Sequence, residues 1–156
     1  MTSLIGTIAA NMFNFELKNN DDSVIDLPEY LNQKRLLIVF FRGAWCNYCK
    51  KQLKEIQSSI SEFDKLNIKI IALSCDNKLN SNLLKEFLKL DYPVLSDNDY
   101  KVIDSFNFRT VYKGKEVSKP AIMLFDNNGT ELYRYVGKEY DDRIETNELL
   151  KQLSNL

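Results

Sequence analysis

The apolar residues in the first half of the chain form two continuous runs with a helical pattern between them. Residues 36–41 are apolar throughout, as expected for a strand that is buried on both faces of a sheet. After Cys49, apolar residues recur at intervals of three and four positions up to Phe63, which predicts one face of a helix. A second apolar run at residues 68–73 predicts the next buried strand. This order predicts two parallel strands connected by a helix.

The second half of the chain predicts further helices and an antiparallel hairpin. The hairpin is indicated by Asp126-Asn127-Asn128-Gly129, a strong turn sequence that separates two apolar runs. Leucines at helical spacing indicate the closing helix. The expected elements are, in order, a helix at 83–90, a strand at 92–95, a helix at 100–106, strands at 121–125 and 132–136, and a helix at 144–156.

Together these elements match the plan of the thioredoxin fold, an α/β fold whose central mixed sheet is flanked by helices. Alternating apolar residues at 13–17, a polar turn at 19–22 and a second run at 24–27 predict a small β-hairpin as an N-terminal extension. No linker, repeat or low-complexity segment interrupts the 156 residues, so we expect a single domain over residues 1–156.

The composition excludes several kinds of site. The chain has no histidine, which excludes a Ser-His-Asp triad, a Cys-His protease pair and a His-ligated metal site. One Cys-x-x-Cys pair and a distant Cys75 are too few for a four-ligand zinc site, so we expect no metal and no cofactor. A net charge of -1 gives no electrostatic signature of nucleic-acid binding, and no apolar run is long enough to span a membrane.

The cysteines and the first residues of the chain indicate a reducing compartment. Three cysteines are an odd number, unlike the paired cysteines of secreted disulfide frameworks. Residues 4–10 are mostly apolar, but they have neither a basic segment nor a cleavage-like site, so a signal peptide is not expected. We therefore expect a cytoplasmic protein.

The segment Trp45-Cys46-Asn47-Tyr48-Cys49 connects the first predicted strand to the first predicted helix. Cys46 is expected at or just before the first helical turn, where unsatisfied backbone N–H groups lower the pKa of a thiol. Cys49 is one turn further along the same side, close enough for a disulfide. This spacing indicates that the Cys46 thiolate attacks a substrate disulfide and that Cys49 then displaces the product. We predict that both are catalytic, in preference to two inert buried cysteines.

Other residues are candidates for weaker or supporting roles. Pro120 precedes the strand at 121–125, where a proline is also tolerated for structural reasons alone. We predict a cis proline that faces the cysteines and holds a loop open for a substrate backbone. Residues 112–117 are expected to form a loop near the active face that shapes the substrate site. For Cys75, a small core residue at a strand end is favoured over a resolving cysteine.

The segment from Phe40 to Leu53 (FFRGAWCNYCKKQL) resembles the peroxiredoxin-like branch of the alkyl hydroperoxide reductase/thiol-specific antioxidant (AhpC/TSA) family, within the thioredoxin superfamily. Three further segments resemble the same family: residues 92–97, Pro120-Ala121 with the turn at 125–129, and the ending from Tyr140 onward. The resemblance covers nearly the whole chain. It implies a thioredoxin fold with an N-terminal extension and an insertion before the second helix of the core.

The resemblance also implies a second assignment of the two cysteines. The family pattern has a proline, a threonine or serine four positions later, and the peroxidatic cysteine three positions after that. On this chain the peroxidatic position is Cys49, the hydroxyl position is Cys46 and the proline position is Arg42. The family's peroxide-activating arginine falls on Pro120. The candidates to replace that arginine are Arg42, Lys119 and Arg109.

A comparison with thioredoxins shows a different departure. Their buried aspartate, which accepts a proton from the second cysteine, corresponds to Phe40 in this chain. Water or another group, with Glu139 as a candidate, would then take the proton from Cys49.

Three functions remain open on the sequence. We favour a thiol–disulfide oxidoreductase that uses the Cys46/Cys49 couple, with Trp45, Pro120 and Arg42 as substrate-binding residues. The first alternative is a thiol-dependent peroxidase that reduces hydroperoxides through a Cys49 sulfenic acid. The second is a redox-sensing or partner-binding module without turnover. The expected partners are a protein disulfide or a hydroperoxide, and a thiol reductant of the thioredoxin or glutathione type.

Overall fold

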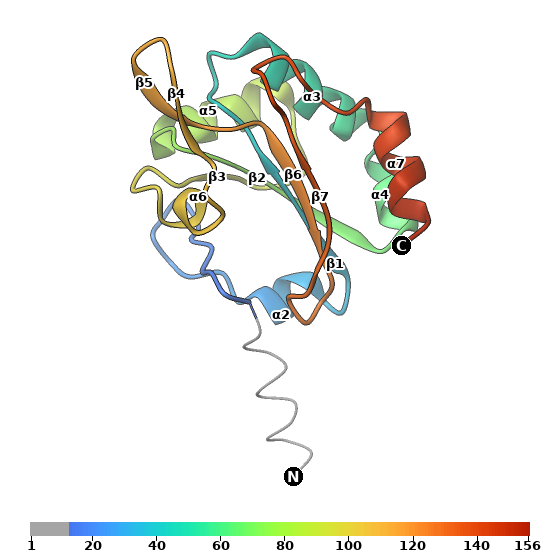
Figure 1. Cartoon of the computed structure of the whole chain (residues 1–156). Coiled ribbons are helices and arrows are strands. Elements are labelled where there is room, and N and C mark those ends of the chain that lie inside the picture. Colours follow the sequence, from blue (N-terminus) through green and yellow to red (C-terminus); the bar gives the residue numbers. More distant parts are fainter. Residues whose placement is uncertain (1–12) are drawn as a thin grey trace.

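A computed structural model describes residues 13–156 of the chain, and its centre is a five-stranded mixed sheet (Figure 1). The strand order is β3-β2-β1-β6-β7. Three strands are parallel, namely β1 (Arg35–Phe40), β2 (Ile68–Ser74) and β3 (Val94–Ser96), and the antiparallel pair is β6 (Ala121–Phe125) and β7 (Glu131–Val136). This is the mixed sheet of the thioredoxin fold that the sequence predicted.

Helices cover both faces of this sheet, and strand β1 shows why. Its residues alternate between two separate core clusters, with Leu37 and Val39 in one and Leu36, Ile38 and Phe40 in the other. Buried residues of α3 (Asn47–Ser58), α4 (Ile60–Lys65), α5 (Lys78–Leu88) and α7 (Thr146–Ser154) belong to the first cluster. The second contains residues of α2 (Leu27–Leu31) and α6 (Lys101–Ser105). Two-sided burial explains the continuous apolar run.

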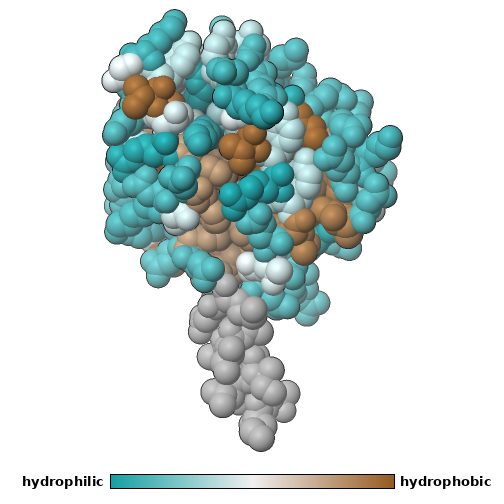
Figure 2. Space-filling model, in the orientation of Figure 1, coloured by the Kyte–Doolittle hydropathy of each residue, from teal (hydrophilic) through white to brown (hydrophobic). Residues whose placement is uncertain are grey.

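The face of the molecule drawn in Figure 2 is largely hydrophilic. Figure 2 shows one face of the molecule, where hydrophobic side chains reach the surface in separate patches among hydrophilic ones. No helix within residues 13–156 has the length and apolar character that crossing a membrane requires. The apolar stretch at residues 4–10 lies outside the described part of the chain.

Three local differences from the sequence prediction have physical causes. The helix expected from Cys49 to Phe63 is interrupted at Ser59, whose φ of -109° and ψ of 18° are not helical. The hydroxyl of Ser58 donates to the carbonyl of Lys54 (3.1 Å), a bond that weakens helical geometry. Apolar periodicity continues across the break because Phe63 still packs into the same core cluster.

The segment expected as a loop at residues 112–117 belongs to a two-stranded hairpin. Strands β4 (Arg109–Tyr112) and β5 (Lys115–Ser118) pair antiparallel, and Gly114 takes a φ of +80° at the turn between them. Only Val117 and Ser118 of these strands are buried, and they are adjacent, so the sequence lacks the apolar alternation that marks a half-buried hairpin.

The N-terminal hairpin is reduced to its turn. Lys18 and Val24 form one isolated antiparallel bridge, and the backbone N–H of Asn19 donates to the carbonyl of Ser23 (2.8 Å). The Asp21 carboxylate accepts from the backbone N–H of Ser23 (2.9 Å), as in turns built on aspartate. The turn predicted at residues 19–22 is therefore confirmed. The flanking segments at 13–17 and 24–27 pair only through the bridge between Lys18 and Val24.

Candidate active site

The junction between β1 and α3 places the two cysteines as the sequence predicted. Cys46 is the N-cap of α3, with φ of -88° and ψ of 114°, and Cys49 lies in the first helical turn. The Cys46 Sγ accepts a hydrogen bond from the backbone N–H of Cys49 at 3.2 Å. A sulfur at the N-cap thus satisfies one of the free N–H groups of the helix, where negative charge is also favoured.

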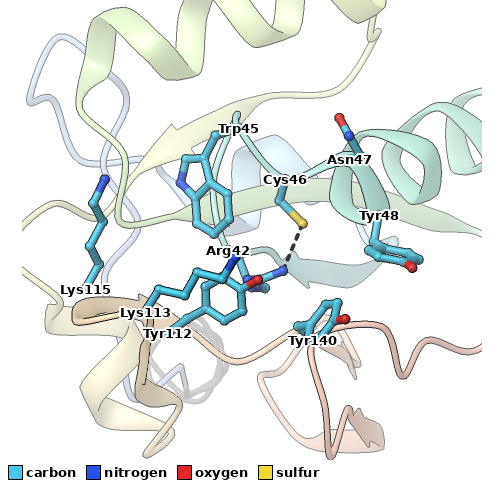
Figure 3. Close-up of a pocket in the computed structure, with 9 residues that line it drawn as sticks. All are labelled: Arg42, Trp45, Cys46, Asn47, Tyr48, Tyr112, Lys113, Lys115 and Tyr140. Atoms are coloured by element: carbon cyan, nitrogen blue, oxygen red, sulfur yellow. Dashed lines mark hydrogen bonds between the residues drawn. The ribbon is translucent and has the colours of Figure 1, made fainter.

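Both thiols are buried, with Cys46 2% and Cys49 0% exposed, but they differ in their relation to a pocket. Cys46 lines a pocket of about 390 Å³, whereas Cys49 is fully buried and is not among the lining residues. Figure 3 shows the Cys46 sulfur directed toward this pocket, which is also lined by Arg42 and by four aromatic side chains. A substrate in the pocket therefore meets Cys46 first.

Arg42, predicted as a substrate contact, lies beside the Cys46 sulfur. Its Nη1 donates to Cys46 Sγ at 3.4 Å, and the residue is only 4% exposed. Three rings surround its guanidinium, with Cζ to ring-centroid distances of 3.8 Å for Tyr112, 4.8 Å for Trp45 and 5.2 Å for Tyr140. We refer to these three rings as the aromatic cage. Cation–π contacts on several sides hold the positive charge in place next to the sulfur.

The cage brings together three separate parts of the chain (Figure 3). Trp45 precedes the first cysteine, Tyr112 ends β4, and Tyr140 lies between β7 and α7. The Trp45 and Tyr112 rings are stacked with their centroids 5.8 Å apart. Gly43 allows this arrangement, because a Cβ at that position would lie 2.3 Å from the Nε1 of Trp45.

Arg143 is a second arginine at the sulfurs, and sequence reasoning missed it. Its Nη2 lies 3.2 Å from Cys49 Sγ and 3.7 Å from Cys46 Sγ. Gln52 holds the guanidinium from α3 (Nη1 to Oε1, 2.9 Å), and the carbonyl of Tyr140 accepts from Nη2 at 3.1 Å. No local pattern distinguishes Arg143 from other charged residues before a helix, because its contacts with the sulfurs and with Gln52 join residues more than 90 positions apart.

These contacts separate the pKa values of the two thiols. The pKa of Cys46 is lowered to about 6, first by the hydrogen bond from the Cys49 thiol, then by the Cys49 backbone N–H and the charges of Arg143 and Arg42. Burial and the hydrogen bond to Cys46 raise the pKa of Cys49 far above its ordinary value. At neutral pH Cys46 is therefore a thiolate and Cys49 a thiol.

Pro120 departs from its predicted geometry. No cis peptide bond occurs within residues 13–156, so the expected cis proline is wrong. Only Lys119 and Pro120 separate β5 from β6, and the Lys119 N–H donates to the carbonyl of Phe108 at 2.7 Å. This short tethered connection runs from one strand into the next with trans geometry. Pro120 lines a neighbouring pocket of about 340 Å³ that it shares with Arg42 and Tyr112, but it does not line the Cys46 pocket.

The remaining candidates do not contact the sulfurs of the pair. Arg109 is held by Asp104 (2.6 Å) and Glu116 (2.9 Å) on the hairpin surface. Cys75 is half-buried, and its Sγ donates to the carbonyl of Glu116 at 3.6 Å. Glu139 is exposed and forms no side-chain hydrogen bond to Cys49. Lys119 lines the pocket of Pro120 and does not line the Cys46 pocket. Of the arginine replacements considered, Arg42 alone lies at the cysteines.

Similarity to known proteins agrees with this geometry. A thiol-disulfide oxidoreductase ResA from Bacillus cereus is 24% identical over 135 residues, which cover 85% of this chain and 71% of that protein. A putative peroxiredoxin bcp from Helicobacter pylori is 30% identical over 105 residues, covering 65% of this chain and 68% of the relative. Among solved structures, peroxidoxin BcpB from Mycobacterium tuberculosis superposes with a TM-score of 0.78 at 20% identity, covering 94% of this chain and 96% of that chain.

The profile of the AhpC/TSA family matches residues 8–132, which is more than half of the chain. Its match includes β1, both cysteines and the β4–β5 hairpin, and it ends within β7. This chain therefore belongs to the AhpC/TSA family.

Proposed function

We propose that this chain is an enzyme, a thiol-dependent oxidoreductase, and that it exchanges thiols and disulfides through Cys46 and Cys49. The observation that carries this proposal is the asymmetry between the two sulfurs. Cys46 lines the pocket and its pKa is lowered to about 6, whereas Cys49 is buried behind it with a raised pKa. A thiolate at the wall of a pocket, with a protonated thiol one helical turn behind it, is the arrangement that disulfide exchange requires.

The exchange takes two displacements. The Cys46 thiolate attacks one sulfur of a substrate disulfide, so that the substrate S–S bond breaks and one substrate thiolate leaves. Cys49 then gives up its proton and attacks Cys46 Sγ, which forms the Cys46–Cys49 disulfide and releases the second substrate thiolate. The substrate gains two electrons and the enzyme loses two. Arg143, 3.2 Å from Cys49 Sγ, stabilises the Cys49 thiolate that the second step needs.

Paired serine variants test this order of attack. We expect Cys46→Ser to abolish reduction of insulin disulfides, because the attacking thiolate is removed. Cys49→Ser should instead accumulate a mixed disulfide on Cys46, visible by mass spectrometry under non-reducing conditions. Cys75→Ser is the matched control and should retain the full rate, since Cys75 does not line the pocket. A Cys46→Ser enzyme with undiminished activity would remove the proposal.

Peroxide reduction is a second candidate, favoured by the similarity to peroxiredoxins in sequence and fold. In this reaction the Cys49 thiolate would attack the O–O bond, release an alcohol or water, and become a sulfenic acid that Cys46 converts to the disulfide with loss of water. Complete burial and the raised pKa of Cys49 disfavour this order of attack. Stopped-flow mixing with hydroperoxides measures the rate at which the cysteines are oxidised. Oxidation no faster than that of a free thiol would exclude a peroxidase.

The cellular setting follows from the same chemistry. We propose a reducing thiol of the thioredoxin or glutathione type as the electron source that returns the Cys46–Cys49 disulfide to the dithiol. We keep the cytoplasm as the proposed location, because an odd number of cysteines is typical of reducing compartments. We also propose that the chain acts as a single domain.

A further inference from the structure

We propose that the Cys46 pocket is selective for small disulfides that carry carboxylates. This inference rests on the proposed thiol–disulfide exchange and names the substrate class for it. It is carried by three features of the pocket: its unbalanced positive charge, the Arg42 guanidinium held beside the Cys46 sulfur, and aromatic walls around a volume suited to a small molecule.

The charge of the pocket is one-sided. Arg42, Lys113 and Lys115 line it and no acidic residue does, although the chain as a whole has a net charge of -1. The two lysines flank Gly114 at the tip of the β4–β5 hairpin and are exposed. Within residues 13–156 neither of them pairs with a carboxylate. Their charge is therefore free to attract an anion to the pocket.

Arg42 adds a fixed positive charge beside the sulfur. Its Nη1 donates to the Cys46 sulfur at 3.4 Å, and the residue lines the pocket. Its Nη2 has almost no accessible surface, so a substrate carboxylate in the pocket interacts with the guanidinium through its charge and not through a bond to this nitrogen. A carboxylate next to the disulfide of a bound substrate has the charge that this group attracts.

The size and walls of the pocket suit a small molecule. Its volume of about 390 Å³ lies within the range of small-ligand pockets. Trp45, Tyr48, Tyr112 and Tyr140 supply apolar surface for the short carbon chain between a disulfide and its carboxylate (Figure 3). In the reaction, the Cys46 thiolate forms a bond to one sulfur of the disulfide, and the other half leaves as a carboxylate-bearing thiolate.

Three small disulfides of similar size and different charge test the selectivity. Dithiodipropionate carries two carboxylates, hydroxyethyl disulfide is neutral, and cystamine carries two ammonium groups. The rate of mixed-disulfide formation on the reduced enzyme is measured for each by rapid quenching and mass spectrometry. Each rate is divided by the rate of the same disulfide with free mercaptoethanol, which removes intrinsic reactivity. We expect the normalised rate of dithiodipropionate to exceed that of hydroxyethyl disulfide about tenfold, and cystamine to be slowest.

A double variant ties the selectivity to the hairpin lysines. Lys113→Gln/Lys115→Gln should lower the ratio of the anionic to the neutral rate, and the charge of Arg42 accounts for the selectivity that remains. Lys65→Gln/Lys151→Gln removes the same charge from the last turns of α4 and α7, which lie far from the β4–β5 hairpin in Figure 1, and should keep the ratio. Equal normalised rates for the three disulfides would show that the substrate class is wrong. An equal fall of the anionic-to-neutral ratio in both double variants would show the same. Either result would leave the proposed disulfide exchange in place. If none reacts faster than with a free thiol, the proposed function itself fails.

Discussion

At the scale of single residues, the two cysteines behave differently because their neighbours differ. Cys46 receives hydrogen bonds from the Cys49 N–H and from Arg42, which stabilise its thiolate. Cys49 receives the backbone N–H of Arg42 (3.4 Å) and lies against Arg143, but complete burial outweighs both contacts and keeps it protonated. The order of attack therefore depends on burial more than on the number of nearby positive charges.

Replacing Arg42 by glutamine should raise the pKa of Cys46 from about 6 toward the ordinary range of a thiol. The charge that favours the thiolate is lost, so alkylation by iodoacetamide at pH 6 should slow by at least about twofold, with a smaller effect at pH 9. The measurement is the pH profile of the alkylation rate. Arg134→Gln, which removes an exposed charge paired with Glu131 on β7, should keep the wild-type profile. An unchanged profile in Arg42→Gln would contradict the role of Arg42.

Replacing Arg143 by glutamine should slow the second displacement more than the first. Arg143 lies closer to Cys49 Sγ than to Cys46 Sγ (3.2 against 3.7 Å), so its loss mainly removes support for the Cys49 thiolate. We expect a mixed disulfide on Cys46 to resolve about tenfold more slowly. Single-turnover mass spectrometry follows its decay, and Arg143→Lys should recover part of the rate. Equal slowing of both displacements would point to a structural defect instead.

At the scale of secondary-structure elements, local signals predicted the junction between β1 and α3, but contacts between distant elements completed the site. The apolar run and the N-cap position placed Cys46 and Cys49 correctly because both depend on neighbouring residues. The β4–β5 hairpin and the segment after β7 contribute Tyr112, Tyr140 and Arg143 through contacts between residues 70 to 98 positions apart in the sequence. Such contacts leave no periodicity. The cis peptide bond expected at Pro120 was wrong. That expectation came from the predicted fold and not from the residues of the short connection to β6.

The loop between β1 and α3 gives a prediction that separates activity from stability. Gly43→Ala should displace the Trp45 indole, because a Cβ would lie 2.3 Å from its Nε1 and 2.8 Å from its Cδ1. Trp45 is 48% exposed and can move outward, so we expect a loss of stability below about 1 kcal/mol. Trp45 is the only tryptophan of the chain, so its fluorescence reports the displacement directly.

A second glycine provides the control for this prediction. Gly129→Ala acts in the turn between β6 and β7, where a φ of +90° strains any residue with a Cβ. It should lower the free energy of unfolding by about 1–2 kcal/mol and leave the fluorescence of Trp45 unchanged. Displacement of Trp45 should also slow attack by Cys46, since the aromatic cage holds Arg42. Wild-type fluorescence and rate in Gly43→Ala would show that the cage does not depend on Gly43.

At the scale of the whole molecule, the separated pKa values predict how the reduction potential of the Cys46–Cys49 couple depends on pH. Below pH 6 the reduced protein holds a proton on each sulfur, and the disulfide holds none. Between pH 6 and the raised pKa of Cys49, the reduced protein holds one proton fewer, because Cys46 is a thiolate. For each proton that the disulfide takes up when two electrons reduce it, the reduction potential falls by about 30 mV as the pH rises by one unit. The slope should therefore be about 59 mV per pH unit below pH 6 and about 30 mV above it.

Redox titration against glutathione or dithiothreitol buffers between about pH 5 and pH 8 measures this change of slope. Arg42→Gln should move the bend to higher pH, in step with its alkylation profile, and Cys75→Ser should leave the bend in place. A bend at the same pH in both assays would mean that one thiolate determines reactivity and potential together. A single slope of about 59 mV per pH unit throughout would mean that Cys46 is a thiol at neutral pH. That result would contradict the proposal that Cys46 attacks first.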